Sequence, residues 1–177
     1  DMADTMKLCV SCKACKRECP TGVDMARMKV EVTALHTEAK GLSLHDWLVA
    51  HLPDYAPYAA AIAPLIRLRD IVPGLAWLSE KLTGFSARRP LPRWQRRWFR
   101  NHELPNSPTH KSSSTTVKPA VLLFIDSFNR YFEPENIRAA VRVLQAAGYD
   151  VFTPMPDGSK QPLCCGRTFL STGMIDR

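Results

Sequence analysis

The spacing of apolar and polar positions predicts a long helix near the start of the chain. Asp24 is a good N-cap residue, the apolar positions that follow it recur at helical spacing, and Gly41 is a typical helix terminator. We therefore predict a helix over residues 25–40. Its apolar stripe, which we expect to face the core, consists of Met25, Met28, Val32 and Leu35.

Residues 43–84 are rich in Ala and Leu and contain several prolines. Since proline disrupts a helix interior, we predict two or three helices broken at the prolines, the last one ending at Gly84. These prolines are Pro53, Pro57, Pro64 and Pro73.

A basic and aromatic stretch, residues 93–100, follows with Pro92 before it, and its composition predicts a short basic helix. Trp94 and Trp98 stand four residues apart and would share one face of that helix. Such a face can dock on a membrane surface or cover a neighbouring domain, and we favour the second interpretation.

The pattern changes after a polar linker at residues 105–119. An apolar run at 120–125 predicts a buried strand, residues 134–147 predict an amphipathic helix, and residues 149–153 predict a second strand. This order predicts a parallel strand–helix–strand unit. The inward residues of its helix are Ile137, Val141 and Leu144, with Gly148 as terminator. The fold class is thus α+β, with a mostly helical domain at 1–104 and the first part of an α/β domain at 120–177.

Composition narrows the choice of partners only slightly. The 177 residues are 45% hydrophobic and carry a formal net charge of +7, which permits an acidic protein face, a membrane surface or nucleic acid. We expect no nucleic-acid partner, because no recognisable motif supports one. The longest uncharged stretch, residues 55–66, is too short to span a membrane and contains prolines. The start has no apolar signal-peptide region, so we expect a cytoplasmic protein, with peripheral contact at the inner face of the membrane as a further option.

Six cysteines fall into two tight groups, which predicts metal ligands in a reducing compartment and not a disulfide framework. The first group has the spacing C-x2-C-x2-C-x3-C-P of bacterial ferredoxins, in which three thiolates ligate one [4Fe–4S] cluster and the fourth ligates another. The alternatives are a zinc site that uses all four thiolates and, less favoured, a disulfide pair. The ferredoxin-like run is Cys9, Cys12, Cys15 and Cys19, and the second group is Cys164 and Cys165.

The ligand count of the run is incomplete. The first cluster would lack a fourth ligand, and Cys19 would lack three companions. We therefore expect a second cysteine run before residue 1, which would make the chain an internal fragment. No nucleophile–base pair, carboxylate pair or phosphate loop stands out, so we expect the chain to transfer electrons while a cofactor elsewhere performs the organic chemistry.

Basic residues surround the cysteine run. They would offset the negative charge of a cluster and raise its potential, or they form an ordinary solvated surface. They are Lys7, Lys13, Lys16 and Arg17.

Four stretches resemble one family. The cysteine run with its flanks, L-C-V-S-C-K-A-C-K-R-E-C-P-T-G-V-D-M-A-R-M-K, is similar to the second cluster motif of proteins that fuse an FAD-linked oxidase to iron–sulfur and cysteine-rich "CCG" domains. D-lactate dehydrogenase, D-2-hydroxyglutarate dehydrogenase and the glycolate oxidase iron–sulfur subunit are relatives in this group. The other stretches are G-F-S-A-R-R-P-L-P-R at 84–93, F-I-D-S-F-N-R-Y-F-E-P-E at 124–135 and L-C-C-G-R at 163–167.

The resemblance implies a function for each part. It implies a CCG domain with a metal or redox role for Cys164 and Cys165, although Ser127 stands where many relatives carry a further cysteine. It also implies an FAD-binding oxidase domain, fused or separate, that oxidises a 2-hydroxy acid. Electrons would then pass through the clusters to a quinone or another electron carrier. The alternative is a stand-alone iron–sulfur or zinc protein with a binding or regulatory role.

Overall fold

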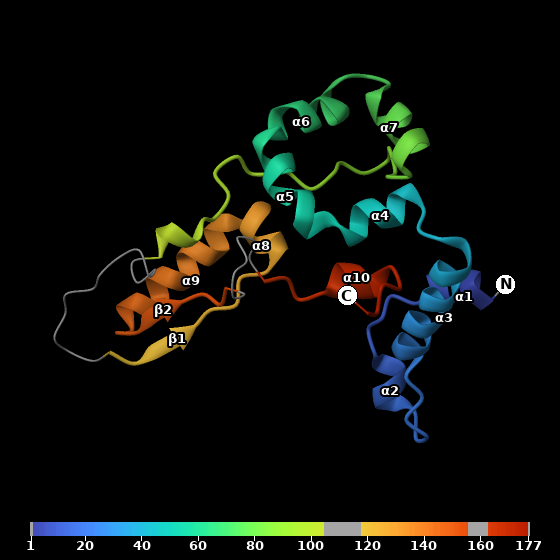
Figure 1. Ribbon diagram of the computed structural model, residues 1–177, viewed down its shortest axis with the longest axis horizontal. Helices are drawn as coiled ribbons and strands as arrows, with labels where there is room; N and C mark the ends of the chain where they lie inside the picture. Colours follow the sequence, from blue (N-terminus) through green and yellow to red (C-terminus); the bar gives the residue numbers. More distant parts are fainter. Residues whose placement is uncertain (1, 105–117, 156–162, 177) are drawn as a thin grey trace. The chain divides into compact units, whose positions relative to one another are not determined.

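The computed structural model describes residues 2–104, 118–155 and 163–176 and is mostly helical, with one small sheet (Figure 1). Its contacts divide the chain into two compact units that are interleaved along the sequence. The first unit comprises the described residues of Asp1–Leu52, Lys81–Phe85 and Gly166–Arg177, and the second comprises those of Pro53–Glu80 and Ser86–Cys165. The consecutive domains expected from the sequence remain a prediction, and most of their linker lies outside the described residues.

The first unit is built around the helix predicted after Asp24. Helix α3 (Met25–Lys40) begins where the Asp24 carboxylate accepts a hydrogen bond from the Arg27 amide at 3.1 Å, and it ends at Gly41, whose φ of 75° is left-handed. The prediction of this helix and of its cap is confirmed. The shorter helices of this unit are α1 (Met2–Lys7), α2 (Ala14–Glu18), α4 (Leu44–Ala50) and α10 (Arg167–Ser171).

The predicted apolar stripe of α3 is wrong in part, because Met28 and Leu35 are 44% and 66% exposed. Helices α1 and α10 pack against α3, and one contact of α10 is made by a small polar residue. The Thr37 hydroxyl donates a hydrogen bond to the Thr172 carbonyl at 2.9 Å. Small residues permit a close approach of backbones that long apolar side chains would prevent.

Residues 44–83 form four helices where two or three were predicted. After α4 come α5 (Leu52–Ala61), α6 (Ala63–Ile71) and α7 (Leu75–Thr83). Pro57 lies inside α5 and does not break it. The hydrogen bond that its missing amide would have donated goes to a carbonyl in the first turn, and three buried alanines hold the helix in place. Pro64 occupies the first turn of α6, and Gly84 follows α7 with a φ of 77°. The buried alanines of α5 are Ala56, Ala59 and Ala60.

The predicted basic helix at 93–100 is absent, since residues 90–100 follow an extended and turning path. The amide of Gln95 donates to the Tyr131 carbonyl at 2.9 Å, and the amide of Phe99 donates to the Arg130 carbonyl at 3.0 Å. These bonds replace the amide bonds of a helix. The Trp94 ring lies 4.3 Å from the ring of Phe132, so this aromatic side chain packs within the second unit, to which the segment belongs.

None of the helices in the described ranges has the length and apolarity needed to cross a membrane.

The predicted strand–helix–strand unit is confirmed. Strands β1 (Ala120–Leu122) and β2 (Asp150–Phe152) are parallel, with Val121 opposite Val151, and α9 (Pro134–Ala146) connects them after the short α8 (Ser127–Tyr131) (Figure 1). The core combines this unit with the segment that ends in the 3-10 turn η1 (Asn101–Glu103). Its buried members are Phe99, Leu104, Ile125, Ile137, Val141 and Val151.

The first strand is shorter and less buried than predicted. It ends at Leu122, which is 68% exposed, and Phe124 beyond it is 47% exposed. Alternate positions of a strand point to opposite faces, and among the described elements α9 packs against the sheet. The residues on the other face of β1 therefore stay exposed.

Candidate metal centre

The four cysteines of the run lie on the loop and short helix between α1 and α3. The Cys9 amide donates to the Met6 carbonyl at 3.1 Å, directly after α1. Ser11 and Lys13 have left-handed backbones, with φ of 57° and 61°. Such residues are uncommon outside glycine, and here they turn the chain between Cys9 and Cys15.

Two of the thiols receive hydrogen bonds from their surroundings. Cys15 lies on α2, and its sulfur accepts a bond from the Met25 amide at 3.4 Å. Cys19 caps the end of α2, and its sulfur lies 3.0 Å from the Thr21 hydroxyl. The Thr21 hydroxyl, followed by the amides of the next residues, lowers the pKa of the Cys19 thiol to about 7, because hydrogen bonds to sulfur favour the thiolate.

Cationic side chains fix the loop from both sides. The Lys29 ammonium of α3 donates to the Cys9 carbonyl at 2.6 Å. On the other side, the Asp24 carboxylate lies 3.6 Å from the Lys13 ammonium and 3.5 Å from that of Lys16. The start and the middle of the loop are therefore tied to the N-cap and the first two turns of α3.

The thiols share one loop, although the structure does not gather them into a metal site. Within the described ranges, no three His, Cys, Asp or Glu side chains stand close enough together to hold a metal ion. Cys12 is exposed, while Cys9, Cys15 and Cys19 are half-buried. The donor set nevertheless fits an iron–sulfur cluster in its chemistry, since it offers soft thiol ligands with N–H and O–H groups directed at sulfur.

Cys164 and Cys165 belong to the second unit, at the point where the chain enters α10. Cys164 is half-buried and Cys165 is exposed, and their metal or redox role remains a prediction. Gly166 follows with a φ of 72° and forms the N-cap of α10. Ser127, the serine at the expected cysteine position, is buried at the start of α8.

Two residues of the loop environment were missed in the sequence. Thr21 could have been found, because a hydroxyl two residues after a cysteine is placed to bond its sulfur. Lys29 carries no such signal. Its role depends on the distance between α3 and the carbonyl of Cys9, which is 20 residues away in sequence.

Comparison with curated proteins points to one enzyme type. The chain is 27% identical to D-2-hydroxyglutarate dehydrogenase of Escherichia coli over 91% of its length, 26% identical to that of Haemophilus influenzae over 81%, and 25% identical to that of Pseudomonas putida over 92%. It spans only 16%, 14% and 17% of the length of these relatives. No family model matches the chain, and no solved structure matches it.

Proposed function

We propose that the chain is the iron–sulfur electron-transfer module of a flavin-dependent 2-hydroxy-acid dehydrogenase. The single observation behind the proposal is the run of four cysteines, which has ferredoxin spacing and receives hydrogen bonds at two sulfurs. The similarity to D-2-hydroxyglutarate dehydrogenases supports the enzymatic context. In this proposal Cys9, Cys12 and Cys15 ligate one [4Fe–4S] cluster, and Cys19 ligates another.

Each residue around the run has a physical task. The Met25 amide lowers the negative charge on the Cys15 sulfur, and the Thr21 hydroxyl does the same for Cys19. Hydrogen bonds of this kind raise the potential at which a thiolate-ligated site accepts an electron. Lys29 fixes the backbone at Cys9, so that the first ligand and α3 keep a constant separation.

A bound cluster supplies one-electron transfer, which fits a module between a two-electron flavin and a one-electron carrier. The flavin domain is the proposed electron donor and a quinone or another carrier is the proposed acceptor. Exposed lysines near the loop suit an acidic face on either partner. Cys164 and Cys165 are proposed as ligands of a further metal or redox centre.

Anaerobic reconstitution of the chain with iron and sulfide tests the proposal. We expect broad absorption near roughly 400 nm, from sulfur-to-iron charge transfer, with iron and sulfide in equal amounts. Substituting Cys12→Ser, which changes an exposed thiol of the run, should abolish most of this absorption. The electron paramagnetic resonance spectrum of the reduced sample should lose its cluster signal in parallel.

The double variant Cys164→Ser/Cys165→Ser is the matched control, because it makes the same chemical change outside the run. It should retain the absorption and the iron content of the run. Tight binding of zinc with no sulfide would contradict the proposal. A band lost in the double variant and kept in Cys12→Ser would contradict it as well.

A further inference from the structure

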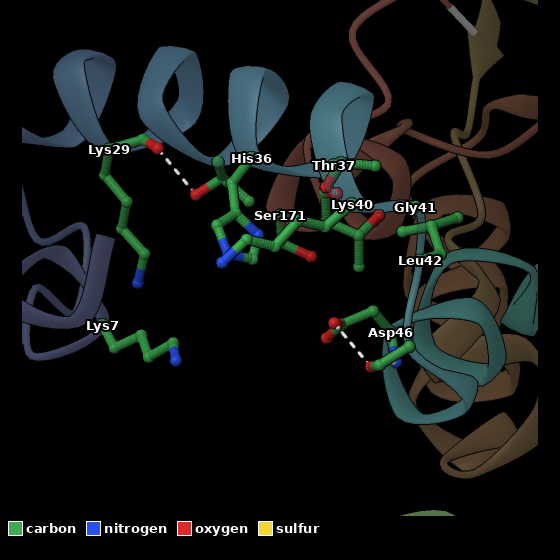
Figure 2. A pocket seen from close by; sticks show the side chains of 12 residues that line it. Lys7, Lys29, His36, Thr37, Lys40, Gly41, Leu42, Asp46 and Ser171 are labelled. Atoms are coloured by element: carbon green, nitrogen blue, oxygen red, sulfur yellow. Dashed lines mark hydrogen bonds between the residues drawn. The ribbon is translucent and has the colours of Figure 1, made fainter. Parts of the chain in front are cut away.

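A cavity of about 590 Å³ opens in the first unit, on the side of α3 that faces α1 and α4 (Figure 2). It is large enough for a small organic molecule, since ligand cavities commonly span about 300–1,000 Å³. Its lining is dominated by cationic and hydroxyl side chains. The ionisable members are Lys7, Lys29, His36, Lys40 and Asp46.

The charges of this cavity are unevenly distributed. Figure 2 shows Lys7, Lys29, His36 and Lys40 gathered at one end, while Asp46 lies at the other. The Asp46 carboxylate already accepts a hydrogen bond from the Ser43 hydroxyl at 2.7 Å. The three lysine ammonium groups therefore lie at one end of the cavity, and the Asp46 carboxylate lies at the other.

The basic side chains of this cavity have few hydrogen-bond partners, although the Asp4 carboxylate interacts electrostatically with both Lys7 and His36. Lys7 forms an exposed ion pair with Asp4 at 2.8 Å, and Lys29 donates to a neutral carbonyl, that of Cys9. Within the described part of the chain, no hydrogen bond or ion pair engages the side chain of His36 or Lys40. Repulsion among like charges in a concave site is relieved when an anion binds there.

Specific contacts hold the wall of the cavity that lies opposite α3. Ser171 and Thr172 line the cavity from the end of α10. The Thr37 hydroxyl donates to the Thr172 carbonyl at 2.9 Å. The rings of His51 and Phe169 meet edge-on at 5.7 Å, which joins α10 to the end of α4. Three elements distant in sequence thus define one preformed pocket.

We infer that this cavity binds a small organic dianion, either a dicarboxylate or a phosphate monoester. Lysine and histidine are suitable donors for both anionic groups. The cavity volume leaves room for a short carbon chain that reaches toward Asp46, whose carboxylate would accept a hydrogen bond from a ligand hydroxyl. The inference uses none of the cysteine thiols, so it stands or fails separately from the proposed function.

Isothermal titration calorimetry of the full chain tests this inference with glutarate and glycerol phosphate as probes and acetate as the monoanion at matched ionic strength. We expect one site for a dianion and weaker or no binding of acetate. The substitutions Lys40→Gln and His36→Gln should each weaken binding roughly threefold, and together roughly tenfold, as expected for loss of partly exposed charged contacts. Lys118→Gln, an exposed lysine of the second unit, is the matched control and should leave binding unchanged.

Far-ultraviolet circular dichroism verifies that each variant retains its helices. The tighter of the two dianions identifies the anionic group that the site prefers, and either result supports the inference. Equal affinity for acetate and the dianions would overturn it. Unchanged binding in the His36→Gln/Lys40→Gln double variant would also overturn it, because the anion would then bind elsewhere.

Discussion

The cysteine loop of the first unit and the α/β core of the second are stabilised by different kinds of contact. In the core, Phe99 and Val151 are 1% and 0% exposed, and the elements meet through apolar side chains. In the loop, the thiols are exposed or half-buried. Single hydrogen bonds and two left-handed residues determine its path.

Arg130 is a buried charge within the apolar core. Its side chain is 2% exposed, and Nη1 donates to the Phe99 carbonyl at 3.1 Å and to Asn101 Oδ1 at 2.8 Å. Burial lowers the pKa of its guanidinium below the ordinary value. The bonds of Arg130 fix the segment that carries Phe99. These polar contacts therefore help to position the Phe99 ring in the apolar core.

The difference between the regions indicates where a bound group would matter. Burial of apolar area stabilises the core without any ligand. A loop with few buried side chains gains order when its thiolates bind a metal, because binding and local folding are then coupled. We therefore expect substitutions in the core to change global stability and substitutions in the loop to change local order.

The largest effect is expected from Phe99→Ala. Removing a fully buried aromatic side chain leaves a cavity and should lower the free energy of unfolding by roughly 3–5 kcal/mol. Phe124→Ala, which truncates a 47% exposed ring in the same unit, should cost about 1 kcal/mol or less. Hydrogen exchange of the α9 amides measures both. An equal loss in the two variants would contradict the expectation that the buried ring contributes more to stability than the exposed one.

An intermediate effect is expected from Gly173→Ala. A Cβ at Gly173 would lie 2.7 Å from backbone atoms of Thr33 and Ala34, and the φ of this residue is +82°. The substitution should therefore cost about 1–3 kcal/mol through overpacking, in addition to the cost of a left-handed backbone. We expect faster hydrogen exchange in α10 and at the middle of α3, because the two segments must separate.

Gly148→Ala is the matched control for that prediction. Its φ of +88° is equally left-handed, while the added Cβ would meet nothing within 4 Å. It should cost only about 1 kcal/mol, from the backbone conformation alone. If both glycine variants lose the same stability, the close packing of Gly173 against α3 is not a stabilising contact.

Local rules in the sequence were enough to predict the regular elements. The Asp24 cap, the Gly41 terminator and the apolar period of 134–146 act within one or two helical turns, and all three are present in the structure. The path of residues 90–100 depends instead on carbonyls of Arg130 and Tyr131, about 30 residues away. No local pattern could reveal those partners, so the helical composition of the segment was misleading.

The candidate site divides in the same way. The spacing of Cys9 to Cys19 predicts a ligand set from sequence alone, and this set remains a prediction. The bond from Lys29 to the Cys9 carbonyl and the pocket beside His36 depend on tertiary packing. The exposure of Met28 and Leu35 has a similar reason. The helical period identifies an apolar face, but it does not identify the elements that pack against that face.

The smallest effect is expected at Asp24, where the loop meets α3. The Arg27 amide, and then Lys13 and Lys16, lower the pKa of the Asp24 carboxyl below its ordinary value of 3.8. A carboxyl with a lowered pKa stabilises the folded form at pH values above its unfolded pKa. That contribution is lost as the pH falls through the folded pKa. Wild type should thus protect the Arg27 amide from hydrogen exchange more than Asp24→Ala does at pH 7, and the difference should disappear in acid.

Asp24→Asn separates the two roles of this carboxylate. Asparagine still caps a helix but cannot pair with Lys13 or Lys16, so its protection of the Arg27 amide should lie between those of wild type and Asp24→Ala. Because the lysine pairs are exposed to solvent on the lysine side, added salt should narrow the gap between wild type and Asp24→Asn. Glu31→Gln, which removes an exposed partner of the Arg27 side chain, should leave the amide unaffected. If protection in Asp24→Asn equals that in Asp24→Ala, the ion pairs and not the cap start the helix, and the loop depends on charge more than on backbone hydrogen bonding.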